Sequence, residues 1–209
     1  MSNAVPISTT YQCVLCSRNM KITSATFIKG IVAPDETLSE STLPQVAFIG
    51  RSNVGKSSVI NTLAAQKGLA KTSSYPGSTQ QINLFLINHK RYLVDLPGYG
   101  FARASAAGRA KIKSLIDGYL FEWGYTQAKV VLIIDAYVGP TDTDREMLQQ
   151  LEAAGKDIVI IANKIDKLKK SDVKRQLESI HHIVGPHHLI PYSAEKKIGI
   201  GELADVVLR

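Results

Sequence analysis

The chain has 209 residues, enough to bury one substantial hydrophobic core but too few for two ordinary domains. Its 44% hydrophobic and 21% charged residues exclude a wholly disordered chain, and no apolar run reaches the roughly 18 residues of a membrane-spanning helix. The formal net charge of +7 would attract a polyanion such as nucleic acid without identifying it. We therefore expect one globular domain with no membrane contact.

The first twenty residues show no regular hydrophobic pattern and no basic start followed by an apolar stretch, so we expect a flexible tail (1–20) and a cytoplasmic location. Cys13 and Cys16 form the only CxxC, and no histidine lies nearby in sequence. We interpret the pair as free thiols rather than a zinc or redox site. Alternating residues then predict an edge strand over Lys21–Ile31, followed by a linker from Pro34 to Pro44.

The rest of the chain alternates short apolar runs with amphipathic stretches, the order typical of βαβ units. The runs are continuous, which suits strands covered on both faces. The predicted strands are Val46–Ile49, Tyr92–Val94, Val130–Ile134 and Ile158–Ile161, and the predicted helices are Lys56–Gln66, Ala106–Trp123, Asp142–Ala154, Ser171–Ile180 and Gly201–Leu208.

A hairpin is predicted from Ile82–Ile87 to Arg91–Asp95, across the turn Asn88-His89-Lys90. It would place one antiparallel strand at the edge of an otherwise parallel sheet. The expected fold is therefore α/β, with a three-layer, doubly wound, mostly parallel sheet over residues 21–209.

A phosphate-binding loop is predicted between the first buried strand and the following helix, where the sequence fits GxxxxGK[ST]. Glycines let the backbone fold around an anion, and successive N–H groups and a helix N-terminus point at the phosphates. Lys56 would add a positive charge near the β and γ oxygens, and Ser57 a hydroxyl for Mg²⁺. The candidate residues are Gly50, Arg51, Ser52, Asn53, Val54, Gly55, Lys56, Ser57 and Ser58.

A second candidate, Asp95-Leu96-Pro97-Gly98, ends the strand that follows the hairpin turn. The carboxylate of Asp95 can hold Mg²⁺ through a water, and the Gly98 N–H can reach a γ-phosphate. In isolation these four residues would be an ordinary turn, but their place downstream of the phosphate-binding loop predicts a γ-phosphate sensor.

The base would be selected by Asn163-Lys164-Ile165-Asp166, which follows another buried strand. A carboxylate only accepts hydrogen bonds, so Asp166 matches the N–H donors on the N1 and N2 edge of guanine and opposes adenine. Lys164 would lie along the base, and Asn163 would tie this loop to the phosphate-binding loop. A backbone N–H from Tyr192-Ser193-Ala194 would meet the guanine carbonyl.

Taken together, the segments GRSNVGKSS, PGSTQ, DLPGYGFA, NKID and SA resemble the EngB/YsxC (YihA) family of the TrmE-Era-EngA-YihA-septin-like GTPases. The resemblance implies a Ras-like P-loop GTPase fold, GTP hydrolysis with Mg²⁺, and a monomer acting as a GTP/GDP switch in large ribosomal subunit assembly, with rRNA and ribosomal protein as partners. It also implies that Thr79, beside Gly77 and Ser78, ligates Mg²⁺, and that Lys56, Thr79 and Gly98 serve catalysis. Two positions depart from the family pattern. Many relatives have a basic residue in place of Ser78, and an arginine near the position of Ala136-Tyr137.

Hydrolysis is expected to be slow, because Tyr99 stands where Ras-type enzymes carry a glutamine that positions the attacking water. A tyrosine with an ordinary pKa near 10 is a poor base at neutral pH. Asn53 matches the residue that coordinates K⁺ in TrmE-like relatives, so we hypothesise K⁺-stimulated hydrolysis. A plain loop role for Asn53 stays open.

Two alternative functions also stay open at this point. One is a GTP-regulated module for cell division or septation without ribosome binding. The other is a P-loop phosphotransferase, which would need an arginine-rich lid and which the guanine-selective tetrapeptide disfavours. The basic run from Lys164 to Arg175 fits either a solvated helix face or an RNA-facing patch.

Overall fold

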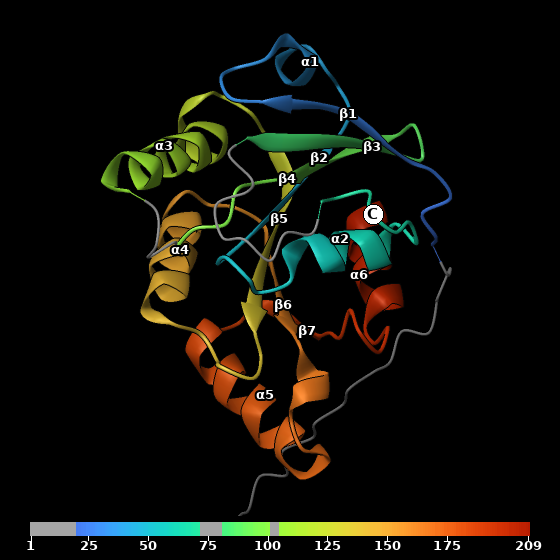
Figure 1. Cartoon of the computed structure of the whole chain (residues 1–209), viewed down its shortest axis with the longest axis vertical. Helices are drawn as coiled ribbons and strands as arrows, with labels where there is room; N and C mark the ends of the chain where they lie inside the picture. The colour runs from blue at the N-terminus through green and yellow to red at the C-terminus, as the bar shows by residue number, and fades with distance from the viewer. Residues whose placement is uncertain (1–19, 72–80, 101–104) are drawn as a thin grey trace, which may run out of the picture.

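The computed structural model describes residues 20–71, 81–100 and 105–209. Within these ranges the centre of the molecule is one twisted sheet of seven strands in the order β1-β3-β4-β2-β5-β6-β7 (Figure 1). The strands are β1 (Ala25–Ile31), β2 (Gln45–Gly50), β3 (Ile82–Ile87), β4 (Arg91–Asp95), β5 (Gln127–Asp135), β6 (Ile158–Asn163) and β7 (His188–Pro191).

The predicted hairpin is present, and β3 pairs antiparallel with both β4 and β1. The remaining pairs, β4 with β2, β2 with β5, β5 with β6 and β6 with β7, are all parallel. The predicted edge strand is also present as β1, so the antiparallel strand β3 has β1 on its outer side. The doubly wound, mostly parallel fold is confirmed.

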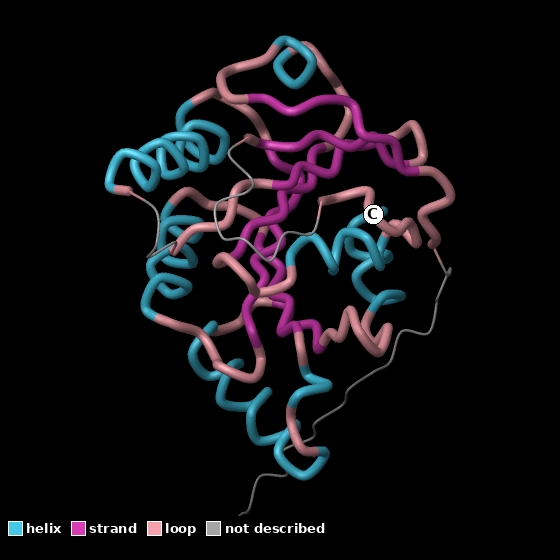
Figure 2. The backbone as a smooth tube through the Cα atoms, in the orientation of Figure 1, coloured by secondary structure: helices cyan, strands magenta, loops and turns pink. Residues whose placement is uncertain are grey.

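Helices cover both faces of the sheet, as the magenta strands between cyan helices show in Figure 2. On one face, α3, α4 and α5 contribute apolar residues to one core cluster, and on the other α2 and α6 contribute to a second. The helical segments are α1 (Glu36–Ser39), α2 (Lys56–Leu63), α3 (Ala106–Asp117), η1 (Gly118–Glu122), α4 (Asp142–Ala153), η2 (Ile165–Lys167), α5 (Lys170–Val184) and α6 (Ile200–Leu208).

The helix predicted over Ala106–Trp123 changes character at Gly118. From there η1 is a π-helix, closed by a 2.8 Å hydrogen bond from the Trp123 N–H to the Gly118 carbonyl. A Cβ at Gly118 would lie 2.4 Å from the indole ring of Trp123, so the absence of a side chain lets the ring fold back over the backbone. The π-turn is therefore a consequence of local packing that helical periodicity does not encode.

The linker predicted between Pro34 and Pro44 contains the single-turn helix α1, which Asp35 caps by accepting from the Thr37 N–H at 3.0 Å. No helix of the described ranges has the length and apolar character needed to cross a bilayer. The expected tail, including Cys13 and Cys16, lies outside the described residues except for Met20.

Parallel strands place their carboxyl ends at one edge of the sheet, and the loops after β2, β4, β5, β6 and β7 therefore gather there. This edge is where ligands bind in open α/β sheets. The predicted phosphate loop follows β2, the γ-phosphate sensor follows β4, and the two base-recognition segments follow β6 and β7.

Candidate functional site

The loop between β2 and α2 has left-handed backbone conformations that favour glycine and asparagine. Gly55 has φ of 94° and Asn53 φ of 67°, both in the left-handed region. A Cβ at Gly50 would lie 2.5 Å from the Ile133 carbonyl of the neighbouring strand. No side chain of the described residues caps α2, whose first N–H groups therefore point into the loop. This combination makes an anion-binding cradle.

The phosphate end of the site contains a buried ion pair. Lys56, 8% exposed, donates to the carboxylate of Asp95, which is 1% exposed and ends β4. Removing one partner of such a pair leaves a buried charge without a partner and typically costs about 3–5 kcal/mol. The pair therefore links the start of α2 to the end of β4.

Gly98 lies against the phosphate loop. The next residue, Tyr99, donates its N–H to the Gly50 carbonyl at 3.3 Å and accepts from the Ser52 N–H at 3.0 Å. A Cβ on Gly98 would come within 3.1 Å of the Ser52 backbone, which is tighter than an ordinary side-chain contact. The structure thus brings the predicted γ-phosphate sensor and the phosphate loop together.

One buried amide joins the two halves of the site. Asn163, 2% exposed, donates from Nδ2 to the Val54 carbonyl at 2.8 Å and accepts at Oδ1 from the Ala194 N–H at 3.3 Å. The contact predicted between Asn163 and the phosphate loop is therefore present. It extends, in addition, to the loop after β7.

Lys164 crosses the same junction. Its backbone is left-handed, with φ of 68°, and its ammonium group donates to the Asn53 carbonyl at 2.7 Å and to Asp135 Oδ2 at 2.7 Å. Asp135 ends β5 in register with Asn163 at the end of β6. Sequence reasoning did not assign Asp135 to the site, although polar residues that end two adjacent parallel strands were a usable signal.

Asp166 faces the segment after β7. The Ser193 hydroxyl donates to Asp166 and also accepts from the Lys196 N–H at 2.9 Å. A cavity of about 560 Å³ lies between these loops, within the range of small-molecule sites. Its walls are Gly55, Ser58, Asn61, Thr62, Lys67, Gly68, Asn163, Lys164, Asp166, Lys167, Ala194 and Glu195.

The side chain of Tyr192 anchors the loop after β7, although our sequence analysis assigned this residue only a backbone role. Its side chain is fully buried, and its hydroxyl is 2.8 Å from Thr62 Oγ1 on α2. Burial raises the pKa of Tyr192 to about 12. Tyr192 therefore couples the base side of the site to the helix that begins at the phosphate side.

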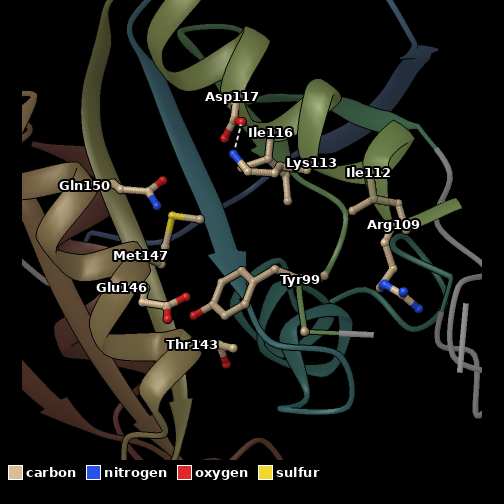
Figure 3. Close-up of a pocket in the computed structure, with 12 residues that line it drawn as sticks. Tyr99, Arg109, Ile112, Lys113, Ile116, Asp117, Thr143, Glu146, Met147 and Gln150 are labelled. Atoms are coloured by element: carbon tan, nitrogen blue, oxygen red, sulfur yellow. Dashed lines mark hydrogen bonds and ion pairs between the residues drawn. The ribbon is translucent and has the colours of Figure 1, made fainter. Parts of the chain in front are cut away.

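Tyr99 points away from the phosphate loop. Its ring is 9% exposed, and its hydroxyl donates to Asp144 Oδ1 on α4 at 2.8 Å. Figure 3 shows this side chain directed towards α4, beside Thr143 and Glu146. Burial first, and the Asp144 charge second, raise the pKa of Tyr99 well above 10. The side chain is therefore a neutral, engaged donor, which agrees with the expectation that it is a poor base.

Arg51 of the phosphate loop approaches the same carboxylate. Its Nε lies 3.8 Å from Asp144 Oδ2 and is buried, with no hydrogen-bond partner among the described residues. A buried donor without a partner costs about 1–3 kcal/mol, so this atom is held in place by its surroundings.

The residues available for Mg²⁺ suit that ion. Mg²⁺ prefers hard oxygen ligands and keeps several waters, so one hydroxyl and one carboxylate are sufficient protein ligands. Ser57 at the start of α2 and the buried carboxylate of Asp95 provide them, and no cluster of three or more His, Cys, Asp or Glu competes within the described ranges. Gly77, Ser78 and Thr79 lie outside the described residues.

A family model and several known proteins match more than half of this chain. The family model described as "50S ribosome-binding GTPase" matches residues 45–164, and that of the "Elongation factor Tu GTP binding domain" matches residues 124–209. A "Probable GTP-binding protein EngB" of Lachnospira eligens is 43% identical over 180 residues, which are 85% of each chain. That of Prosthecochloris aestuarii is 45% identical over 77% of this chain and 84% of its own.

The fold is likewise similar to that of a solved "probable GTP-binding protein engB". The two superpose with a TM-score of 0.66, at 24% identity, over 78% of this chain and 96% of the other.

The buried tyrosines predict a loss of stability at high pH. Burial raises the pKa values of Tyr99, Tyr119 and Tyr192 above 10 in the folded state. Below about pH 10 both states keep the protons; above it the unfolded chain releases them first, so the free energy of unfolding falls by about 1.4 kcal/mol per pH unit for each group. Chemical denaturation at several pH values between about 9 and 12 would measure this slope.

In that experiment Tyr192→Phe should make the slope shallower, while Tyr137→Phe, at a position 60% exposed, should leave it unchanged. Equal slopes for Tyr192→Phe and the unmodified chain would contradict the assignment.

Proposed function

The chain belongs to the EngB family of P-loop GTPases, and from this premise we propose which residues bind GTP, how hydrolysis proceeds and what it controls. We assign the G domain to residues 21–209 and leave residues 1–20 outside it. The single observation that carries the proposal is the Asn163 amide, which holds the phosphate loop and the base-side loops around one cavity.

In this proposal the phosphates lie on the backbone N–H groups of the loop from Gly50 to Ser58, with the Lys56 ammonium beside them. Gly98 donates its N–H to the γ-phosphate. Ser57 and Thr79 would hold Mg²⁺ directly and Asp95 through a water, and the ion would neutralise charge on the phosphate oxygens. Lys56, Thr79 and Gly98 act during hydrolysis by stabilising the charge that develops on the transferred group.

Guanine is proposed to occupy the cavity beside Asp166. The carboxylate accepts from N1–H and N2–H, and the Ser193 hydroxyl that donates to it fixes its orientation. The stem of Lys164 lies along the base, since its ammonium group is held by Asp135 and Asn53. The Ala194 N–H, which donates to Asn163 Oδ1 at 3.3 Å, is shared in this proposal between that oxygen and the guanine carbonyl.

Hydrolysis is proposed to be slow without help. The Tyr99 hydroxyl is engaged by Asp144, so this position supplies no group that orients the attacking water. We propose that K⁺, held by Asn53, compensates by stabilising the developing negative charge. The left-handed backbone of Asn53 places this residue at the turn of the phosphate loop.

The nucleotide state is proposed to control binding to a large ribosomal subunit precursor, through rRNA and ribosomal protein. The matching model's description as a ribosome-binding GTPase and the net charge of +7 support an anionic ribonucleoprotein partner. We propose a cytoplasmic monomer. Membership in a GTPase family favours hydrolysis over phosphoryl transfer to a small acceptor.

Base recognition is tested by Asp166→Asn. An amide would present a donor to the N–H groups of guanine, so GDP affinity should fall about 10- to 100-fold. The same amide pairs with the C2 carbonyl of xanthine, so affinity for xanthosine diphosphate should rise. Titration calorimetry with GDP, xanthosine diphosphate and ADP measures both changes, and an unchanged GDP affinity would show that the base lies elsewhere.

The proposed K⁺ site is tested by comparing turnover in K⁺ and Na⁺. The unmodified chain should hydrolyse GTP about tenfold faster in K⁺, because a cation at this place stabilises the transition state. Asn53→Gly removes the side-chain oxygen while tolerating the positive φ, and should make the two rates equal. Equal rates for the unmodified chain would refute K⁺ stimulation.

Ribosome binding is tested by sedimentation with purified large subunits and their precursors. The chain should co-sediment in a non-hydrolysable GTP analogue and be released in GDP, with a strong dependence on salt. Bovine serum albumin serves as the non-binding control. No co-sedimentation in either nucleotide would favour a switch acting elsewhere, as in cell division.

A further inference from the structure

The carboxylate of Asp144 on α4 accepts more contacts than its helix requires. Oδ2 accepts from the Thr141 N–H at 2.9 Å and from the Thr141 hydroxyl at 2.7 Å, which completes the capping box of α4. Oδ1 accepts from the Tyr99 hydroxyl at 2.8 Å, and Arg51 Nε lies 3.8 Å from Oδ2. The Asp144 side chain is 1% exposed, so these contacts stand in place of water.

Two of the contacts lead directly into the nucleotide site. Tyr99 follows Gly98, and Arg51 follows Gly50 in the phosphate loop. The backbones of Tyr99 and Arg51 also form a parallel bridge. Asp144 therefore meets the side chains of two residues whose main chains are already paired, and we call Arg51, Tyr99 and Asp144 the α4 clamp.

The ring of Tyr99 depends on this clamp for its orientation. It lines a cavity of about 560 Å³ between α3 and α4, together with Ile112, Ile116 and Met147 (Figure 3). A ring that borders a cavity has fewer packing neighbours on that side than one enclosed in the core. The hydrogen bond from the Tyr99 hydroxyl to Asp144 is then the contact that fixes the direction of the ring. Burial raises the pKa of Tyr99 and so keeps this hydroxyl protonated.

We propose that Asp144 is a positioning residue that lets the site distinguish GTP from GDP. By accepting from the Tyr99 hydroxyl and attracting the Arg51 guanidinium group, it keeps the Gly98 N–H aligned with the phosphate loop, where a γ-phosphate would meet it. This inference rests on the proposed role of Gly98. GDP lacks the γ-phosphate, so its affinity depends on the clamp much less.

The physical reason is the steep dependence of a hydrogen bond on its geometry. An N–H donor prefers an angle at hydrogen above about 150°, and its interaction weakens steeply below about 120°. Gly98 is held beside Ser52 by the two backbone hydrogen bonds of Tyr99, one of them 3.3 Å long. A small rotation of the Tyr99 side chain and backbone would therefore change the direction of the neighbouring Gly98 N–H.

The test compares the affinities of GDP and of a non-hydrolysable GTP analogue, both in Mg²⁺. Tyr99→Phe keeps the ring and removes the hydroxyl, and Asp144→Asn keeps the size and removes the charge. For both, the ratio of the analogue's Kd to that of GDP should rise about fivefold, the value of one net hydrogen bond. The Kd of GDP itself should change by less than about twofold.

Tyr119→Phe is the matched control. It also deletes a buried tyrosine hydroxyl that donates a hydrogen bond, to Gln45 Oε1 at 2.9 Å, but at a place outside the nucleotide site. Thermal unfolding should show a lower midpoint for all three variants, whereas the affinity ratio should change only for Tyr99→Phe and Asp144→Asn. If Asp144→Asn fails to fold, Tyr99→Phe decides.

An unchanged ratio in Tyr99→Phe, or an equal rise in Tyr119→Phe, would overturn the proposal. A rise in Tyr99→Phe with an unchanged ratio in a folded Asp144→Asn would show that the charge of Asp144 has no part in the role, since the asparagine oxygen can still accept from the Tyr99 hydroxyl. These failures are distinct from failure of the proposed function, in which the unmodified chain would bind ADP as tightly as GDP or would not bind the guanine nucleotides.

Discussion

The site depends on one buried amide. Asn163 ends β6, and from there it donates to the phosphate loop and accepts from the loop after β7, so that three segments distant in the sequence form one surface. Gly55 makes this approach possible, since a Cβ at that position would lie 2.5 Å from the Asn163 amide nitrogen. The glycine that forms the phosphate cradle is therefore also the residue that admits the base-side loop.

Two residues at this junction have unfavourable backbone conformations. Asn53 and Lys164 are non-glycine residues with positive φ, and each is fixed by the contact between them, from the Lys164 ammonium to the Asn53 carbonyl. Such conformations cost of order 1–3 kcal/mol each and persist only when the surrounding structure enforces them. The buried pair of Lys56 with Asp95 is a further contact, at the phosphate end, between segments distant in the sequence.

Local signals predicted the fold well and the side-chain network poorly. Continuous apolar runs identified β2, β5 and β6, and the glycine-lysine-serine pattern located the start of α2, because these signals lie within short windows. Tyr99 and Asp144 are 45 residues apart and meet only through tertiary structure, and neither spacing nor composition links them. The π-turn after Gly118 has the same origin. Family resemblance predicted the GTPase activity, whereas the identity of the partner depends on surface chemistry that motifs do not describe.

The most direct test of this account is a crystal structure of the chain with Mg²⁺ and a non-hydrolysable GTP analogue. The account predicts guanine in the cavity between α2 and the loop after β7, with its N1 and N2 edge on Asp166, and the phosphates on the backbone of the loop between β2 and α2. The Asn163 contacts to Val54 and Ala194 should be intact. A base bound outside that cavity, or phosphates away from the loop, would contradict the account.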